Sequence, residues 1–162
     1  MATAQQLIDA KYSNQLAIND QNLKSIFGET LIGWGRKNDC VSYEDFKLKT
    51  GDLDLSYKGL KTLKGLEYLT ALTDLRLYGN SLTDIGSVSG LTALTALYLD
   101  NNSLTVAMVD AKLSQCRDAY DGGAPFSSGI QLQGNAIPTG GDSNADYVYL
   151  TGQGISVTID NS

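Results

Sequence analysis

The 162-residue sequence contains no histidine, and this absence removes several kinds of chemistry at once. Histidine is the most frequent general base, a frequent zinc ligand and the usual side chain that titrates near neutral pH. A catalytic nucleophile needs a neighbouring base, and the Lys, Asp and Glu residues that remain do not converge in the sequence pattern. We therefore expect a protein without enzymatic activity, catalytic residues, cofactors or a metal site.

Cysteine is also scarce, since the chain has only Cys40 and Cys116. Their spacing matches neither a CxxC motif nor a known pattern of metal ligands. Free cysteine is among the most frequently buried residue types, which favours two buried thiols. A single disulfide between the two is the alternative.

Positive charge and long apolar runs are likewise limited. The chain has 12 Lys and Arg against 18 Asp and Glu, a net charge of −6 and a pI near 4.4. Nucleic acids and anionic membranes would be repelled by such a surface, so neither is an expected partner. No stretch approaches the roughly 18 apolar residues of a membrane span, so we expect no membrane insertion. The first residues lack the basic and apolar regions of a secretory signal, which predicts synthesis in the cytoplasm without a signal peptide.

A repeat occupies the middle of the chain. Three Leu-x-Leu cores, at residues 53–55, 75–77 and 97–99, follow one another at intervals of 22 residues. Asn80 and Asn102 occupy the same place in successive repeats, and Lys58 stands there in the first. Self-similarity at such a period is typical of stacked repeat proteins, in which each repeat buries its apolar side chains against the next.

The pattern L-x-x-L-x-L-x-x-N-x-L resembles the 22-residue, internalin-type leucine-rich repeat of bacteria over residues 42–105. This resemblance implies an α/β leucine-rich-repeat solenoid with short parallel strands on a concave face. Alternation along each strand points the leucines inward. The amides of three asparagines can bond backbone groups of the adjacent repeat that would otherwise be buried unpaired, so we assign them a structural role. These residues are Asn80, Asn102 and Asn135.

The repeat changes after residue 104. Residues 106–116 have helical apolar spacing with Thr105 as a plausible N-cap, and strands are expected at 130–132 and 155–159 with a short helix at 145–150. This tail resembles a C-terminal module of phage and prophage structural proteins and related bacterial surface proteins, although Ile155 stands where that module often has tryptophan. The matching residues are Val109, Asp110, Ala111, Leu132, Gly134, Asn135, Ala136, Pro138, Gly140, Leu150, Gly152, Gly154 and Val157.

The N-terminal segment has no repeat register. Residues 4–12 and 20–27 have the pattern of short amphipathic helices, and the segment serves either as a docking arm for another subunit or as a helical cap on the first repeat. We therefore divide the chain into an N-terminal arm or cap, 1–40, and a leucine-rich-repeat domain, 41–162, whose residues 106–162 form a C-terminal cap module. The candidate docking residues are Leu7, Ile8, Leu23, Phe27 and Trp34.

The outward positions of the strands form the candidate binding surface. Tyrosine and arginine most often anchor interfaces, although tyrosines that merely cover a sheet explain the same pattern. The candidate concave-face residues are Asp54, Arg76, Tyr78, Tyr98, Asp100 and Gln131.

These observations predict a non-enzymatic structural or adhesive component of a phage or phage-like particle, such as a fibre, decoration or tail-adaptor protein. Residues 1–38 would attach it to other virion or assembly proteins, and the repeats would face outward toward a host surface protein or glycan. The expected location is the virion, and the expected state is a homo-oligomer or part of a larger assembly. The alternative is a bacterial leucine-rich-repeat interaction module, in the cytoplasm or at the cell surface, that binds a protein or glycan on its concave face.

Overall fold

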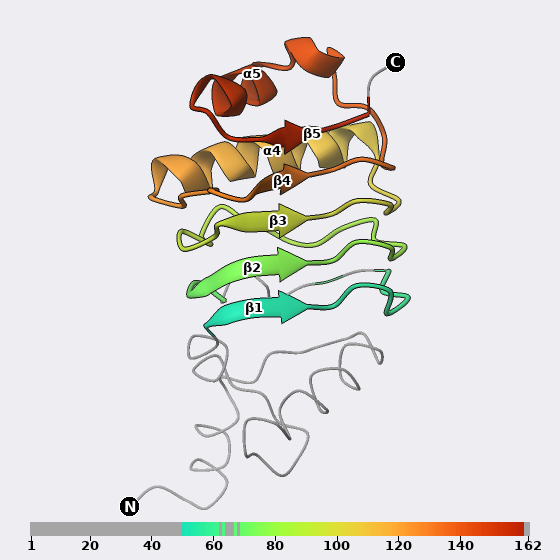
Figure 1. Cartoon of the computed structure of the whole chain (residues 1–162). Helices are drawn as coiled ribbons and strands as arrows, with labels where there is room; N and C mark the ends of the chain where they lie inside the picture. Colours follow the sequence, from blue (N-terminus) through green and yellow to red (C-terminus); the bar gives the residue numbers. More distant parts are fainter. Residues whose placement is uncertain (1–49, 62, 64–66, 68, 161–162) are drawn as a thin grey trace, which may run out of the picture.

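The structure, a computed structural model, describes residues 50–61, 63, 67 and 69–160. They form an α/β arrangement in which a five-stranded parallel sheet is accompanied by two α-helices (Figure 1). The strands are β1 (Gly51–Asp54), β2 (Leu72–Arg76), β3 (Ala96–Tyr98), β4 (Gly129–Gln131) and β5 (Val157–Thr158). The helices are α4 (Val106–Asp121), the 3₁₀ helix η2 (Gly141–Ser143) and α5 (Ala145–Gly152).

The order of the strands in the sheet is their order in the chain, and every neighbouring pair is parallel. Leu53 pairs with Leu75, which pairs with Leu97, so the 22-residue sequence repeat is also the repeat of the sheet. The short parallel strands that the resemblance implies are therefore present.

The last strand is shorter than predicted. Only Val157 and Thr158 belong to β5, because only Ile130 and Gln131 of the short strand β4 pair with it. Ile155 and Ile159 contribute buried apolar side chains instead of ladder pairs.

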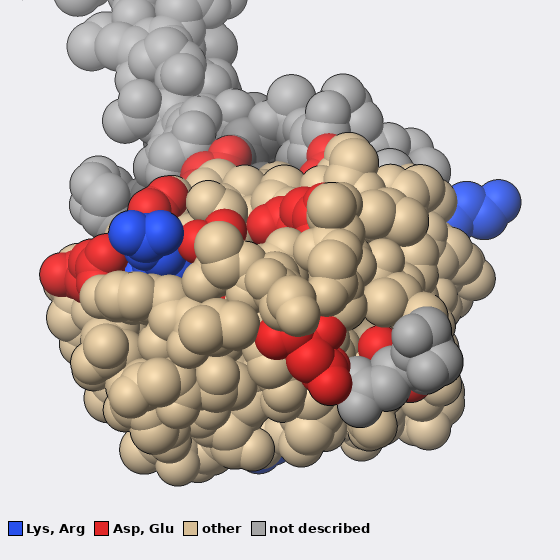
Figure 2. All heavy atoms as spheres, turned by 90° about the horizontal axis from the view of Figure 1, so that it is seen from above, with Lys and Arg blue, Asp and Glu red and all other residues tan. Residues whose placement is uncertain are grey.

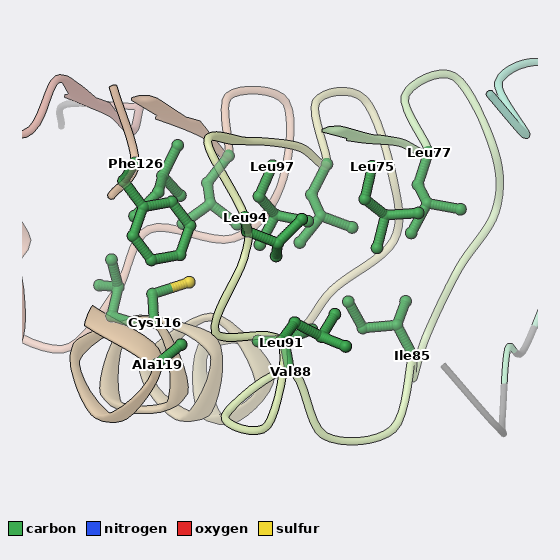
Figure 3. Packing of buried hydrophobic residues seen from close by; sticks show 14 of the residues in the cluster. Leu75, Leu77, Ile85, Val88, Leu91, Leu94, Leu97, Cys116, Ala119 and Phe126 are labelled. Carbon is green, nitrogen blue, oxygen red and sulfur yellow. The ribbon is translucent and has the colours of Figure 1, made fainter. Parts of the chain in front are cut away.

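The core lies between the sheet and the segments that connect its strands. Leu75 and Leu97 of the strands, and Leu77 directly after β2, point toward Ile85 and Val88 of a connecting segment, and all five are fully buried (Figure 3). Each such side chain contributes roughly 1.5–3 kcal/mol when it is removed from water. Because these positions recur with the repeat, the core continues from one repeat to the next.

Helix α4 covers the core after the third repeat (Figure 1). Val109, Leu113 and Cys116 lie three or four residues apart, and all are buried in the cluster that Phe126 also joins. Thr105 occupies the N-cap position, but its side chain makes no capping hydrogen bond, contrary to our expectation. The buried face, which continues past the predicted end at residue 116, accounts for the helix without such a cap.

Within the C-terminal module, the half-buried carboxylate of Asp110 connects α4 to the start of α5. Asp110 accepts hydrogen bonds from the amide of Thr139 at 2.8 Å, from the hydroxyl of Thr139 at 2.5 Å and from the side chain of Asn144 at 3.2 Å. The Oδ1 atom of Asn144 in turn accepts from the amides of Asp146 and Tyr147, which caps α5. One carboxylate of α4 therefore fixes the start of α5.

The side chain of Asn80 connects two successive repeats. Its Nδ2 donates to the carbonyls of Leu55 at 2.9 Å and Leu77 at 2.8 Å. Its Oδ1 accepts from the amides of Lys58 at 2.9 Å and Leu60 at 3.1 Å. Since Asn80 is buried, these bonds satisfy backbone groups that would otherwise lack partners.

The same arrangement recurs in the two following repeats. The Nδ2 of Asn102 donates to Leu77 and Leu99 at 3.0 and 2.9 Å, and its Oδ1 accepts from the amide of Leu82 at 3.1 Å. The Nδ2 of Asn135 donates to Leu99 and Leu132, both at 2.9 Å. Each asparagine therefore bonds at least one carbonyl of its own repeat and one of the repeat before.

Cys116 is a free thiol that is fully buried among the apolar side chains of the core. Burial raises its pKa from 9.0 to about 12, because the thiolate would lack hydration, while the nearby Lys112 opposes the shift. Cys40 lies outside the described residues.

The arm predicted at residues 1–40 also lies outside the described residues. This holds for the docking residues Leu7, Ile8, Leu23, Phe27 and Trp34. The boundary between the arm and the repeat domain therefore stays a prediction.

The asparagine bonds can be tested with Asn80→Ala. The substitution leaves buried carbonyls and amides without partners, and we expect the free energy of unfolding to fall by about 2–4 kcal/mol in urea denaturation. Lys58→Ala is the matched control, because Lys58 occupies the same repeat position with an exposed side chain and should change stability by less than about 0.5 kcal/mol. Equal losses from the two substitutions would contradict the assigned role of Asn80.

The burial of Cys116 predicts an inert thiol. In a Cys40→Ser background, Cys116 should react with iodoacetamide far more slowly in the native protein than in denaturant, since the thiolate is the reactive form. Between pH 9 and about 12 the unfolded chain loses the thiol proton and the folded chain keeps it, so Cys116 should make stability fall as pH rises. Cys116→Ala should make this decline shallower. Native labelling as fast as labelling in denaturant would contradict the burial.

Candidate binding surface

One row of side chains crosses the outward face of the sheet. Asp54, Arg76, Tyr98, Gln131 and Thr158 occupy corresponding positions in the five strands. The flanking apolar side chains point into the core, so the side chains of this row point to the opposite face of the sheet. For the last strand, the register places Thr158 in the row.

A second row of side chains, which includes Asp100 and Gln133, follows where the strands end. The amide of Gly79 donates to the carbonyl of Asp100 at 2.9 Å, and the amide of Asn101 donates to that of Gln133 at 2.7 Å. These bonds continue the parallel pairing and place Asp100 beside the neighbouring chain segments. The second row therefore stays in register with the first.

Residues of both rows line an open concavity of about 650 Å³. Asp54, which the sequence predicted as part of the surface, does not line it. That residue lies on the first strand, where its Oδ1 accepts from the amide of Ser56 at 2.9 Å. We call this concavity the sheet groove, and its lining residues are Arg76, Tyr78, Tyr98, Asp100, Asn101, Gln131, Gln133, Gly134 and Asp160.

Arg76 is paired on the outward face. Its Nη1 lies 2.8 Å from Oδ2 of Asp52, and this hydrogen bond raises the pKa of the guanidinium. The guanidinium carbon also lies 5.9 Å from the centre of the Tyr98 ring. Because both members of the ion pair are partly exposed, we expect the pair to add little stability and to act mainly by orienting Arg76.

Asp100 is a half-buried carboxylate in the sheet groove. Burial raises its pKa, while hydrogen bonds from its own amide and that of Gln133 oppose the rise and the nearby Asp160 adds to it. The Oδ1 of Asp100 accepts from the amide of Gln133 at 3.2 Å, and Oδ2 of Asp160 accepts from the amide of Gly134 at 2.7 Å. Backbone amides thus position both carboxylates in the groove.

Tyr78 and Tyr98 both line the groove, as neighbouring outward positions predict. The ring that packs on Tyr78 is nevertheless that of Tyr57, edge to face at a centroid distance of 5.2 Å. Tyr57 is 74% exposed and lies in a turn at a positive φ of 56°. Sequence reasoning did not single it out, because the repeat has no constant residue at that position.

The far end of the groove depends on close backbone contact. Gly134 has a φ of +73°, and a Cβ added there would lie 2.4 Å from Oδ1 and 2.9 Å from the amide nitrogen of Asn101. Asn101 itself has a positive φ of 52°. Glycine is therefore required for the approach of these two segments.

The groove joins planar amides, tyrosine rings and carboxylates, which suit stacking and hydrogen bonding to a ligand. Among the described residues, no group of three or more His, Cys, Asp or Glu side chains could hold a metal ion. No helix in the same part of the chain is long and apolar enough to cross a membrane.

The end of the molecule that carries α5 exposes more acidic than basic atoms (Figure 2). Arg117 of α4 is paired there, at 3.2 Å from Asp146, and its guanidinium carbon lies 4.6 Å from the centre of the Tyr149 ring. Tyr149 donates its hydroxyl to Asp121 at 2.6 Å. These contacts join α4 to α5.

Comparison with protein-family models finds no family that matches the chain, and comparison with curated proteins finds no match.

The contact between Gly134 and Asn101 can be tested with Gly134→Ala. Both the positive φ and the overlap with backbone atoms should lower the free energy of unfolding, together by about 2–4 kcal/mol in urea denaturation. Gly154→Ala is the control, because Gly154 has a φ of +83° but no atom within 4 Å of an added Cβ. It should lose only about 1–2 kcal/mol. If the free energy of unfolding falls by the same amount in both variants, the contact with Asn101 is not the reason for glycine at position 134.

Proposed function

We propose that this chain is a non-enzymatic leucine-rich-repeat solenoid that binds a ligand on the outward face of its sheet. We further propose that it acts as a structural or adhesive component of a phage or phage-like particle, attached through residues 1–38. The observation that carries the proposal is the sheet groove, in which side chains from three successive strands meet.

The solenoid is supported by the agreement between sequence period and sheet register. Leu53, Leu75 and Leu97 pair in order, and each is buried. Asn80 and Asn102 make the same inter-repeat bonds 22 residues apart. Repetition of both the core and the polar connections supports the stacking that a solenoid requires.

The binding role is supported by the composition of the groove. Tyr78, Tyr98 and Arg76 are the residue types that most often anchor interfaces, and all three are half-buried rather than fully covered. The groove offers fewer of the side chains that catalysis requires. Asp100 and Asp160 are acidic, but a histidine base is absent from the whole sequence.

The assignment to a phage or phage-like particle is supported by the C-terminal module. Asp110, which the resemblance to phage structural proteins includes, bonds Thr139 and Asn144 and so joins α4 to α5. The alternative, a bacterial leucine-rich-repeat interaction module, would use the same groove and differs in the role of the arm.

Self-assembly through the arm can be tested by light scattering after size exclusion. The full chain should form a defined oligomer, and the double variant Phe27→Asp with Trp34→Asp should be a monomer with an unchanged circular dichroism spectrum, because two apolar docking residues become charged. The control, Gln21→Asp with Asn22→Asp, adds the same charge to polar positions of the arm and should stay oligomeric. A monomeric wild-type chain would contradict self-assembly and favour the bacterial interaction module.

A further inference from the structure

We propose that the sheet groove binds a cationic peptide segment, with a lysine or arginine side chain held between the tyrosine rings and the carboxylates of Asp100 and Asp160. This inference rests on the proposed ligand-binding function and specifies its ligand class. Charge, aromatic surface and the cost of covering the carboxylates each favour this occupant.

The charge of the groove is negative. Asp100 and Asp160 contribute two carboxylates, whereas Arg76 is the one basic residue among the lining residues. Arg76 does not neutralise them, because its guanidinium bonds Asp52 at 2.8 Å. A ligand that carries positive charge therefore meets complementary charge, and an anionic ligand is repelled.

The hydrogen bonds of the two carboxylates leave capacity for a ligand. Asp100 accepts from the amide of Gln133 through Oδ1, and Asp160 accepts from the amide of Gly134 through Oδ2. A carboxylate has two oxygens and about four acceptor positions, so each retains places for an ammonium or guanidinium donor. The hydrogen bonds from these backbone amides hold the two carboxylates in position before a ligand binds.

The tyrosine rings suit the same cation. The guanidinium carbon of Arg76 lies 5.9 Å from the centre of the Tyr98 ring, near the outer limit of a cation–π contact, so the ring is already positioned next to a positive charge. Tyr78 is also half-buried and lines the same groove. Cations are attracted to the faces of such rings, and the attraction grows when water is excluded.

A neutral ligand such as a glycan is less favoured. It would cover Asp100 and Asp160 without providing an opposite charge, and burial of an uncompensated carboxylate is costly. Asp100 is already half-buried, and that burial raises its pKa. A cation removes the penalty because it pairs with the carboxylates, while Gln131 and Gln133 are placed to bond peptide groups of the ligand.

The test uses the full ¹⁵N-labelled chain and three probes followed by NMR. The probes are an acetyl-Gly-Arg-Gly-Arg-Gly amide peptide, the same peptide with citrulline in place of arginine, and maltohexaose. Citrulline keeps the shape of arginine and removes its charge. The arginine peptide should shift the amide signals of Asn101, Gln133 and Gly134, and it should bind about tenfold or more tightly than the citrulline peptide.

Matched variants locate the binding. Asp100→Asn and Asp160→Asn keep the oxygen that accepts the backbone amide and remove the charge, so each should weaken binding of the arginine peptide about tenfold without loss of folding. Asp118→Asn makes the same change at an exposed carboxylate of α4 that does not line the groove, and it should leave affinity unchanged. Equal weakening by all three would overturn the assigned site.

The outcomes separate the ligand class from the proposed function. Equal binding of the arginine and citrulline peptides, or shifts at Asn101 and Gln133 with maltohexaose alone, would overturn the cationic ligand and leave a binding groove. If no probe shifts these signals, the cationic ligand is overturned and the groove loses its support as the binding surface.

Discussion

The hydrogen bonds between asparagine side chains and the backbone of the preceding repeat are the interaction on which the rest of the structure depends. Each repeat is too small to bury its leucines alone, so its stability requires a neighbour at a fixed distance. Asn80, Asn102 and Asn135 set that distance, because each bonds a carbonyl of its own repeat and one of the repeat before. The leucine core supplies the larger free energy, but it is non-directional, and the amides determine the register.

This register also creates the candidate binding surface. When strands pair in line, Arg76, Tyr98 and Gln131 form one outward row, although long connections separate them in the chain. The spacing from Asn80 to Asn102 is 22 residues, whereas that from Asn102 to Asn135 is 33, and α4 occupies the longer connection. The sheet tolerates this insertion because the helix lies behind it. Within this chain the buried positions of the first three strands are alike, whereas the outward positions Asp54, Arg76 and Tyr98 differ.

The sequence predicts what is periodic and misses what is not. Alternation and the 22-residue period suffice for the first three strands and their buried leucines, and alternation alone indicates the positions of the last two strands. They do not predict that Asp160 joins the groove, since its contact with Gly134 bridges 26 residues outside the repeat. Nor do they predict that Lys112 is buried, with its Nζ donating to the carbonyl of Gly86 and to Gln115. The contacts of Asp160 with Gly134 and of Lys112 with Gly86 come from tertiary packing, and no local pattern specifies them.

Residue-resolved amide hydrogen exchange tests the central claim most directly. The amides of Leu60, Leu82 and Leu104 donate to asparagine Oδ1 atoms, whereas those of Leu55, Leu77 and Leu99 donate to backbone carbonyls of the next strand. If asparagine bonds hold the repeats together, the first set should exchange as slowly as the second, because both open only when neighbouring repeats separate. Exchange of the first set at the rate of an unstructured peptide, with the second set still protected, would contradict the account.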